Sequence, residues 1–173
     1  MKLLIVLGEG GHTKQMLNLV NLLMNTDHSK APSEPGAQNQ DYQLHYIISR
    51  QDHLSAGHIK HPGPIYRVTR PRGKSTGKLG AALLTLVATV ESLWILLRVR
   101  PAAIISAGPA IAVPASILGK LLGARVIYLE SSSRISRPSV TGRILYRWAD
   151  LFFVQWEQLQ SSYPRALFAG RLV

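Results

Sequence analysis

Three glycines and a histidine stand directly after the first predicted strand, in an arrangement that suits the binding of an oxyanion. The segment reads Gly8, Glu9, Gly10, Gly11, His12 and Thr13. Glycine lets the backbone turn tightly and present amide groups, and the N-terminus of the helix that follows adds positive partial charge. A tight turn without a ligand, with His12 bonded only to the loop, is the structural alternative.

The same segment departs from a dinucleotide fingerprint. Thr13 stands where the third glycine of GxGxxG would be, and no acidic residue closes the second predicted strand, which ends at Ser49 and Arg50. A small NADP-binding protein that uses Arg50 on a 2′-phosphate stays open as an alternative, although it would ordinarily carry that third glycine.

Two later turns carry groups that could share a site with the glycine segment. Gly108 and Pro109 follow a predicted strand and let the next helix begin abruptly, with its N-terminus facing the same crevice. Glu130 closes another strand and is followed by the polar run from Ser131 to Arg134. Such a carboxylate could act as an acid, a base or a ligand of a sugar hydroxyl. The alternative is that Glu130 pairs with Arg134 or caps a short helix.

Metal and cysteine chemistry have little support in the sequence. The chain has no cysteine and no DxD motif, and the histidines at 53, 58 and 61 lack cysteines or carboxylates at the spacing of a zinc site. We therefore expect metal-independent chemistry without a resident cofactor.

The elements that must position these groups alternate between strand-like and helix-like segments. Strands are predicted over 2–7, 43–49, 64–69, 102–106, 125–130 and 151–155, and helices from 13 onward and over 79–99, 110–122 and 139–149, with loops over 26–41 and 70–78. This alternation predicts an α/β fold, a Rossmann-like doubly wound parallel sheet, formed by residues 1–173 as a single domain. Ligands of such sheets bind beyond the carboxyl ends of the strands, where the glycine turns and Glu130 are expected.

The charge of the chain indicates an anionic partner. Lys and Arg number 20 against 9 Asp and Glu, and residues 50–147 hold fifteen of the basic residues but only three acidic ones. Part of this excess forms a basic loop with Arg67, Arg70, Arg72, Lys74 and Lys78. A membrane surface, a phosphorylated substrate or a nucleic acid would each reward such clustering. Because aromatic residues are not interleaved with the basic loop and no recognition motif is present, we expect no nucleic-acid partner.

The long apolar segment over 79–99 raises the question of a membrane. Its 21 residues are enough to cross a bilayer core at about 1.5 Å per residue. Glu91 inside it, basic residues on both sides and its place as a crossover helix favour interfacial or buried placement instead. The first residues lead straight into the first strand without a hydrophobic anchor. We therefore expect peripheral attachment, at the cytoplasmic face of a membrane.

Three stretches together carry a resemblance to a known family. They are GEGGHT at 8–13, the block ISAGPAIAVPASILGKLLGARVIYLESSSRISRPSVTGRILYRWADLFFVQW at 105–156, and YPRALFAGRL at 163–172. In this order they resemble the asparagine-linked glycosylation protein fourteen family, which includes bacterial capsule and exopolysaccharide proteins. The glycine loop, the SAGP turn and the strand-end glutamate are more distantly similar to the N-terminal half of MurG-type transferases of the GT-B fold.

The resemblance implies one subunit of an inverting glycosyltransferase. This subunit would bind a lipid-linked diphosphate acceptor, while a separate donor-binding subunit would hold the UDP-sugar, either UDP-N-acetylglucosamine or UDP-glucuronic acid. By similarity His12 or Glu130 would be the catalytic group. The acceptor and its phosphates would contact Gly8, Gly10, Gly11, Thr13, Gly108, Ser131 and Arg134. A scaffold that recruits the donor subunit without catalytic residues is the nearest alternative.

Overall fold

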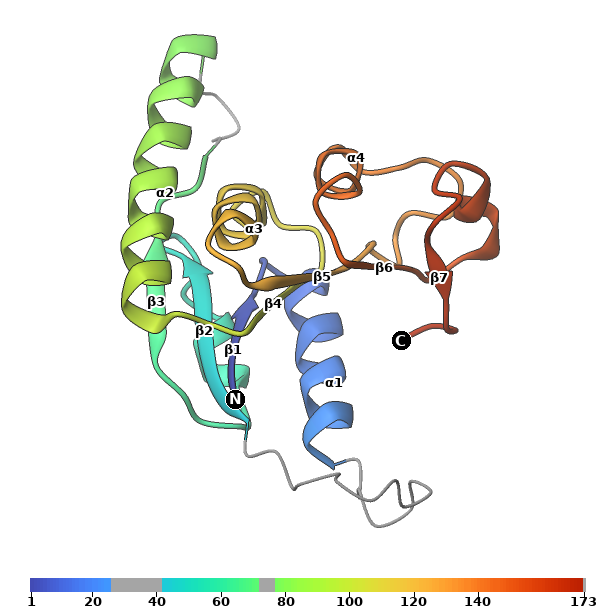
Figure 1. Cartoon of the computed structure of the whole chain (residues 1–173), viewed down its shortest axis with the longest axis horizontal. Coiled ribbons are helices and arrows are strands. Elements are labelled where there is room, and N and C mark those ends of the chain that lie inside the picture. Colours follow the sequence, from blue (N-terminus) through green and yellow to red (C-terminus); the bar gives the residue numbers. More distant parts are fainter. Residues whose placement is uncertain (26–41, 72–76, 173) are drawn as a thin grey trace.

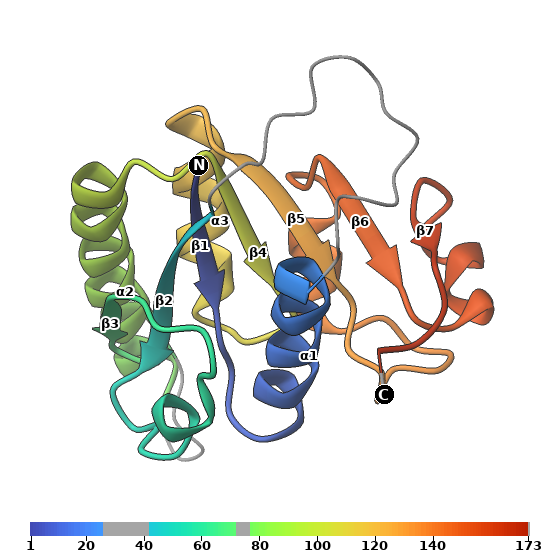
Figure 2. The same cartoon turned by 90° about the horizontal axis from the view of Figure 1, so that it is seen from below.

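Seven parallel strands form one sheet in the order β3-β2-β1-β4-β5-β6-β7 (Figure 2). The computed structural model describes residues 1–25, 42–71 and 77–172. The strands are β1 (Lys2–Val6), β2 (Gln43–Ser49), β3 (Ile65–Val68), β4 (Ala103–Ser106), β5 (Arg125–Leu129), β6 (Leu151–Val154) and β7 (Leu167–Phe168). The predicted α/β, Rossmann-like doubly wound sheet is thus confirmed.

Helices cover both faces of this sheet (Figure 1). Helix α1 (Gly11–Asn25) lies on one face, and α2 (Lys78–Val99), α3 (Ala112–Leu121) and α4 (Val140–Leu145) lie on the other. Alternate residues of β1 enter separate cores, since Leu3 and Ile5 pack with Met16 of α1, whereas Leu4 and Val6 belong to the core that holds Leu96 of α2. Burial on both faces explains why the strands read as continuous apolar runs.

The order of the strands reverses beside β1. The chain runs outward from β1 to β3, then returns through α2 to place β4 on the other side of β1, with Val6 paired to Ser106. The loops that leave the carboxyl ends of β1 and β4 therefore diverge to opposite faces. Such a switch point opens a crevice for ligands, and both glycine turns lie there.

Some elements differ from the predicted ranges. Helix α4 is shorter than the predicted 139–149, because after Leu145 the chain continues as turns, with Trp148 N donating to the Leu145 carbonyl at 2.9 Å. The two-residue strand β7 and the 3₁₀ helices Ser55–His58 and Glu157–Ser161 were not predicted, and each is too short to show a hydrophobic period. The predicted loop over 26–41 lies outside the described residues, as do residues 72–76 of the loop over 70–78.

Candidate functional site

A pocket of about 350 Å³ opens at the carboxyl ends of β1 and β4. It collects residues from the glycine turn, the loop before α3, the ends of β2 and β3, and α4. Its lining comprises Leu7, Gly8, Glu9, His12, Ser49, Arg70, Gly108, Pro109, Ala110, Ile111 and Thr141. The pocket therefore gathers four of the predicted site residues from three separate parts of the chain.

Two glycines make the room that His12 occupies. A Cβ atom on Gly8 would lie 2.9 Å from the His12 Cβ, and one on Gly108 would lie 2.9 Å from the His12 Cε1. Gly108 also has a φ of +90°, which disfavours any side chain. By contrast, Gly10 and Gly11 face open space. Gly8 and Gly108 thus serve the packing of the imidazole, whereas Gly10 and Gly11 leave the start of α1 uncovered for a ligand.

The environment of His12 favours its neutral form. Burial is the main cause that lowers the pKa of His12, and the positive charge of Arg134 lowers it further. The backbone carbonyl of Ala107 and the charge of Glu130 oppose this shift but do not outweigh it. The buried Nδ1 of His12 has no well-aligned hydrogen bond within the described part of the chain, so the Ala107 carbonyl acts on the ring only as a weak electrostatic neighbour. A neutral imidazole at the wall of a pocket can accept a proton.

Glu130 is fully buried and its carboxylate accepts five hydrogen bonds. Oε1 accepts from the Ser131 amide at 3.0 Å and the Tyr128 hydroxyl at 3.5 Å. Oε2 accepts from the Ser139 amide at 3.2 Å, the Ser139 hydroxyl at 3.1 Å and the Tyr163 hydroxyl at 3.2 Å. Burial and the neighbouring Glu130 charge raise the pKa values of Tyr128 and Tyr163, so both hydroxyls stay protonated as donors.

Through these contacts Glu130 fixes the position of α4. Ser139 is the N-cap of α4, and its hydroxyl accepts from the Gly142 amide at 2.8 Å, so the carboxylate holds the start of that helix. A Cβ atom on Gly142 would lie 2.1 Å from Oε2, which leaves space only for glycine. Glu130 does not line the pocket. Glu130 acts on His12 through its charge, and its hydrogen-bond partners include the N-cap Ser139 of α4 but not Arg134.

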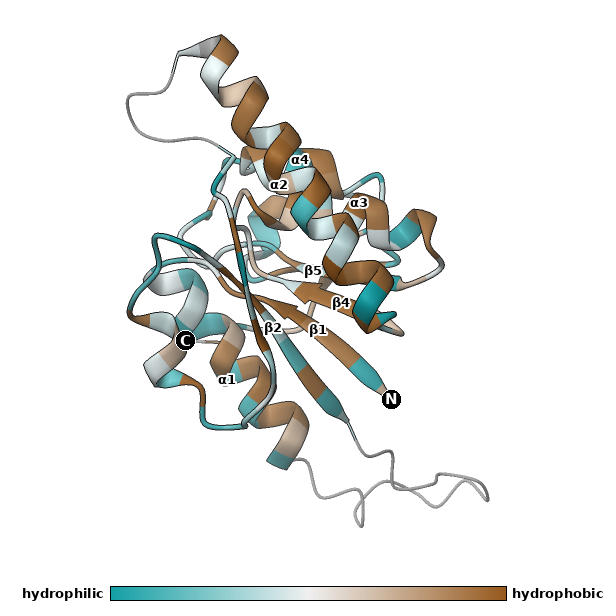
Figure 3. Cartoon of the chain, turned by 90° about the vertical axis from the view of Figure 1, so that its left-hand side faces the viewer, coloured by the Kyte–Doolittle hydropathy of each residue, from teal (hydrophilic) through white to brown (hydrophobic). Residues whose placement is uncertain are grey.

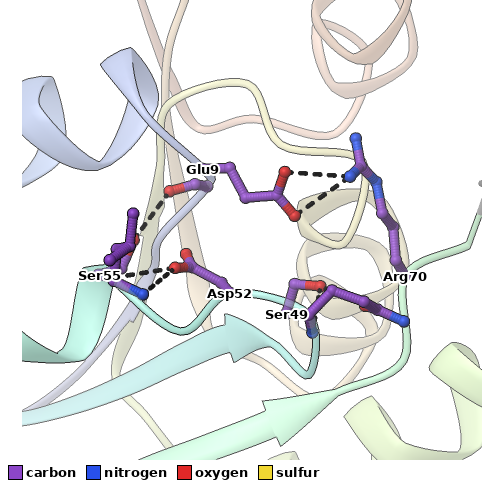
Figure 4. Close-up of polar contacts among 8 residues, drawn as sticks. Glu9, Ser49, Asp52, Ser55 and Arg70 are labelled. Atoms are coloured by element: carbon purple, nitrogen blue, oxygen red, sulfur yellow. Dashed lines mark hydrogen bonds and ion pairs between the residues drawn. The ribbon is translucent and has the colours of Figure 1, made fainter.

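An ion pair links two exposed side chains at the pocket (Figure 4). Arg70 Nη1 lies 3.1 Å from both carboxylate oxygens of Glu9, and the two side chains are 42% and 45% exposed. Thr69 anchors the chain just before Arg70, since its amide donates to Glu91 Oε2 at 2.6 Å, and Arg50 pairs with the other Glu91 oxygen at 2.6 Å. A carboxylate of α2 therefore fixes the end of β3 from which Arg70 extends.

The remaining predicted site residues lie away from the pocket wall. Buried Thr13 uses its hydroxyl on Ser55 Oγ at 2.7 Å, and buried Ser131 shares a hydrogen bond with Ser133 Oγ at 2.9 Å. Arg134 is exposed, and Arg67 donates to the Asp52 carbonyl at 3.1 Å. Arg72, Lys74 and the side chain of Lys78 lie outside the described residues. Among the described residues no group of three His, Cys, Asp or Glu side chains could hold a metal ion.

Several residues of the site were not predicted from the sequence. Glu9 stands inside the glycine segment and Ser49 at the end of a predicted strand. These positions could have indicated that both residues line the pocket. Thr141 comes from α4 and had no local signal. Asp52 is also buried beside this site (Figure 4), where its Oδ1 accepts from the Ser55 amide at 2.9 Å. Its Oδ2 finds no partner among the described residues.

Helix α2 carries hydrophobic residues along most of its length (Figure 3). Its apolar stretch Leu79–Val99 is long and hydrophobic enough to cross a membrane, and only 22% of its most apolar window is buried. The exposed large side chains of this helix form its apolar surface and are Leu79, Leu83, Leu86, Val87, Val90, Leu93, Trp94 and Leu97. This exposure is not that of a core helix, and the apolar surface lies on the same helix as Glu91.

The sequence of the whole chain matches a known protein family. The family model described as "Oligosaccharide biosynthesis protein Alg14 like" matches residues 3–172. The chain belongs to this family. The mouse protein named UDP-N-acetylglucosamine transferase subunit ALG14 is 30% identical to this Alg14-like chain, over all of the chain and 83% of the mouse protein.

Solved structures share the fold of the Alg14-like chain at low identity. MurG of Acinetobacter baumannii superposes with a TM-score of 0.69 and 17% identity, over 91% of this chain and 42% of MurG. The UDP-GlcNAc 2-epimerase of Neisseria meningitidis, bound to UDP-GlcNAc, gives a TM-score of 0.68 and 13% identity, over 99% of this chain and 47% of the epimerase. The chain thus spans less than half the length of either protein, and its fold corresponds to the N-terminal half of the GT-B protein MurG.

Proposed function

We propose that this Alg14-like protein is the acceptor-side subunit of a two-part inverting glycosyltransferase. It binds a lipid-linked diphosphate acceptor at the cytoplasmic face of a membrane and joins a separate donor-binding subunit. The donor is UDP-N-acetylglucosamine, in keeping with the names of its relatives, with UDP-glucuronic acid as the alternative. The observation that carries the proposal is the placement of His12, which Gly8 and Gly108 hold in a pocket at the switch point of the sheet, where burial lowers its pKa.

The need for a partner is supported by the names of the relatives, since the mouse protein is named a subunit of a UDP-N-acetylglucosamine transferase. The described residues of this chain form one Rossmann-like sheet. A GT-B enzyme places its substrates between two such sheets. Residues that hold the UDP-sugar are therefore assigned to the second subunit, and this chain needs no resident cofactor or metal for its share.

The proposed reaction uses His12 as the base. An acceptor hydroxyl oxygen attacks the anomeric carbon of the donor, the bond to UDP breaks, and the hydroxyl proton passes to the neutral imidazole. The glycine turn at Gly10 and Gly11, where an added Cβ would meet nothing within 4 Å, and the N-terminus of α1 bind the acceptor phosphates beside the pocket. Glu130 positions α4, which brings Thr141 to the pocket. Its negative charge also stabilises the imidazolium ion that forms.

Membrane attachment is assigned to the apolar surface of α2. A helix with leucine and tryptophan side chains exposed on this scale suits the boundary between headgroups and acyl chains. Glu91 does not oppose this placement, because its carboxylate turns toward Arg50 and Thr69 of the protein. The attachment is therefore peripheral, with the pocket close to the lipid that carries the acceptor.

Reconstitution tests the proposal. The chain is co-expressed with a candidate donor-binding subunit, and transfer from labelled UDP-N-acetylglucosamine or UDP-glucuronic acid to a lipid extract is measured for the wild type and for H12A. The expected result is transfer that needs both subunits and falls sharply in H12A. Efficient transfer by this chain alone would contradict the two-part enzyme. Unaltered turnover in H12A would leave the scaffold alternative.

A further inference from the structure

The described lining of the pocket carries balanced charges, although the pocket is proposed to bind a dianionic diphosphate. Among the described residues this lining holds one cation, Arg70, and one anion, Glu9, besides His12. Glu9 already contacts the Arg70 guanidinium, since Arg70 Nη1 lies 3.1 Å from both carboxylate oxygens. A phosphate that entered beside Arg70 would meet this carboxylate at close range. The two anions would repel each other there, and they therefore compete for the guanidinium.

We infer that the Glu9 carboxylate binds Arg70 only in the absence of acceptor, and that the phosphate of the lipid-linked acceptor replaces Glu9 on Arg70 when the acceptor enters the pocket. This inference rests on the proposed function. It assigns Arg70 to recognition of the acceptor phosphate, and it assigns Glu9 a selective role, because only a ligand group more strongly anionic than a carboxylate displaces it.

Because the Glu9–Arg70 pair is exposed, separating the two side chains requires little free energy. Both side chains are nearly half exposed, so Glu9 can turn into solvent without leaving a buried charge. An exposed ion pair of this kind changes an equilibrium by a factor of about five or less. Phosphate offers a doubly hydrogen-bonded, more highly charged partner to the planar guanidinium, and such contacts are among the strongest in proteins.

The position of Arg70 also orders the ligand along the molecule. Glu91 of α2 binds the Thr69 amide at 2.6 Å, so Arg70 begins next to the helix assigned to the membrane. His12 lies deeper, between Gly8 and Gly108. A lipid-linked acceptor that enters from the side of α2 would meet Arg70 with its phosphates first, and its sugar would then lie toward His12.

Binding of farnesyl diphosphate to the full chain tests the exchange. E9Q should lower the Kd about fivefold, because the competing carboxylate is gone, and R70Q should raise it about tenfold or more. In the R70Q background, E9Q should gain less than about twofold, since the competition needs Arg70. The matched controls are E157Q and R125Q, which remove the same charges from exposed residues outside the pocket lining and should change the Kd little. An E9Q variant that binds no better than wild type, or that gains equally with and without Arg70, would overturn the inference.

Two further experiments distinguish the exchange at Arg70 from binding of a lipid headgroup and from the proposed function itself. Phosphatidylglycerol vesicles test whether a lipid headgroup is the ligand, and an E9Q gain confined to the vesicles would overturn the assignment to the acceptor. In the reconstituted enzyme, E9Q should lower and R70Q should raise the acceptor KM. If transfer proceeds and neither variant changes that KM, the exchange fails while the proposed function stands. If no sugar is transferred but the binding series behaves as expected, the exchange stands and the proposed function fails.

Discussion

Alanine at Gly108 tests whether this glycine turn is required for the packing of His12. Gly108 has a φ of +90°, and an added Cβ would lie 2.9 Å from His12 Cε1 and 3.1 Å from its Nδ1. Gly123 provides a matched control, because it has a φ of +92° and an added Cβ there would meet nothing within 4 Å. G123A therefore carries the backbone strain alone, and G108A carries the same strain together with the collision.

The expected losses can be worked out from these two parts. A side chain forced to positive φ costs about 1 to 2 kcal/mol, which predicts the loss of unfolding free energy in G123A. Overpacking of a filled site adds about 1 to 3 kcal/mol, so G108A should lose about 2 to 5 kcal/mol. Urea unfolding of the two variants measures the difference. In thermal scans G123A should melt about 2 to 8 °C below the wild type.

Function should separate the two variants more sharply than stability. G108A displaces the imidazole, and a misplacement of about 1 Å can cost about 100-fold in rate, whereas G123A should leave turnover of the reconstituted enzyme unchanged. The NMR titration of His12 should also move upward toward its ordinary pKa in G108A, because the ring becomes less buried. Equal losses of stability and activity in the two variants, with an unmoved His12 titration, would refute the packing argument.

Three further changes test the other parts of the site. Because burial lowers the pKa of His12, its neutral form persists below pH 6.5, so transfer should hold its rate to a lower pH than an ordinary histidine allows, and H12N should reduce kcat about 100-fold or more across the pH profile. E130Q should lower the free energy of unfolding in urea by about 1.5 to 3 kcal/mol, because an amide group then faces hydroxyl and amide donors; an unchanged midpoint would contradict the five-bond geometry. L86D on α2 should weaken sedimentation with vesicles about tenfold, whereas L54D, at an even more exposed leucine outside α2, should not; equal binding by both would exclude α2 as the contact.

The layers of the fold could be predicted from local sequence. Each central strand is a short apolar run, and the long apolar segment over 79–99 is too long for a strand. The run 43–49 coincides with β2, and the segment 79–99 begins one residue after the start of α2. The ends of elements were less predictable where a cap or a turn decides them. Helix α4 ends at Leu145 since turns follow it, although the pattern of apolar residues continues to Ala149.

The site could be predicted only where its residues lie close in sequence to a strand end. Gly8, His12 and Gly108 met this condition and now line one pocket. The pairing of Glu9 with Arg70 spans 61 residues and depends on how β3 ends beside α2. The surroundings of Glu130 were less predictable than its strand-end position, because three of its five hydrogen bonds come from Ser139 and Tyr163 after the chain has folded back.

The hydrogen bonds of Glu130 also bear on how the protein folds during synthesis. Its donors come from Tyr128, Ser131, Ser139 and Tyr163, so no ribosome-bound chain shorter than 163 residues can satisfy this carboxylate. A carboxylate buried without its donors is strongly unfavourable. The last third of the chain is therefore expected to consolidate late and as one cooperative unit, with its amides gaining protection from hydrogen exchange together. The N-terminal strands can pair earlier, while this unit decides when the pocket acquires its wall from α4.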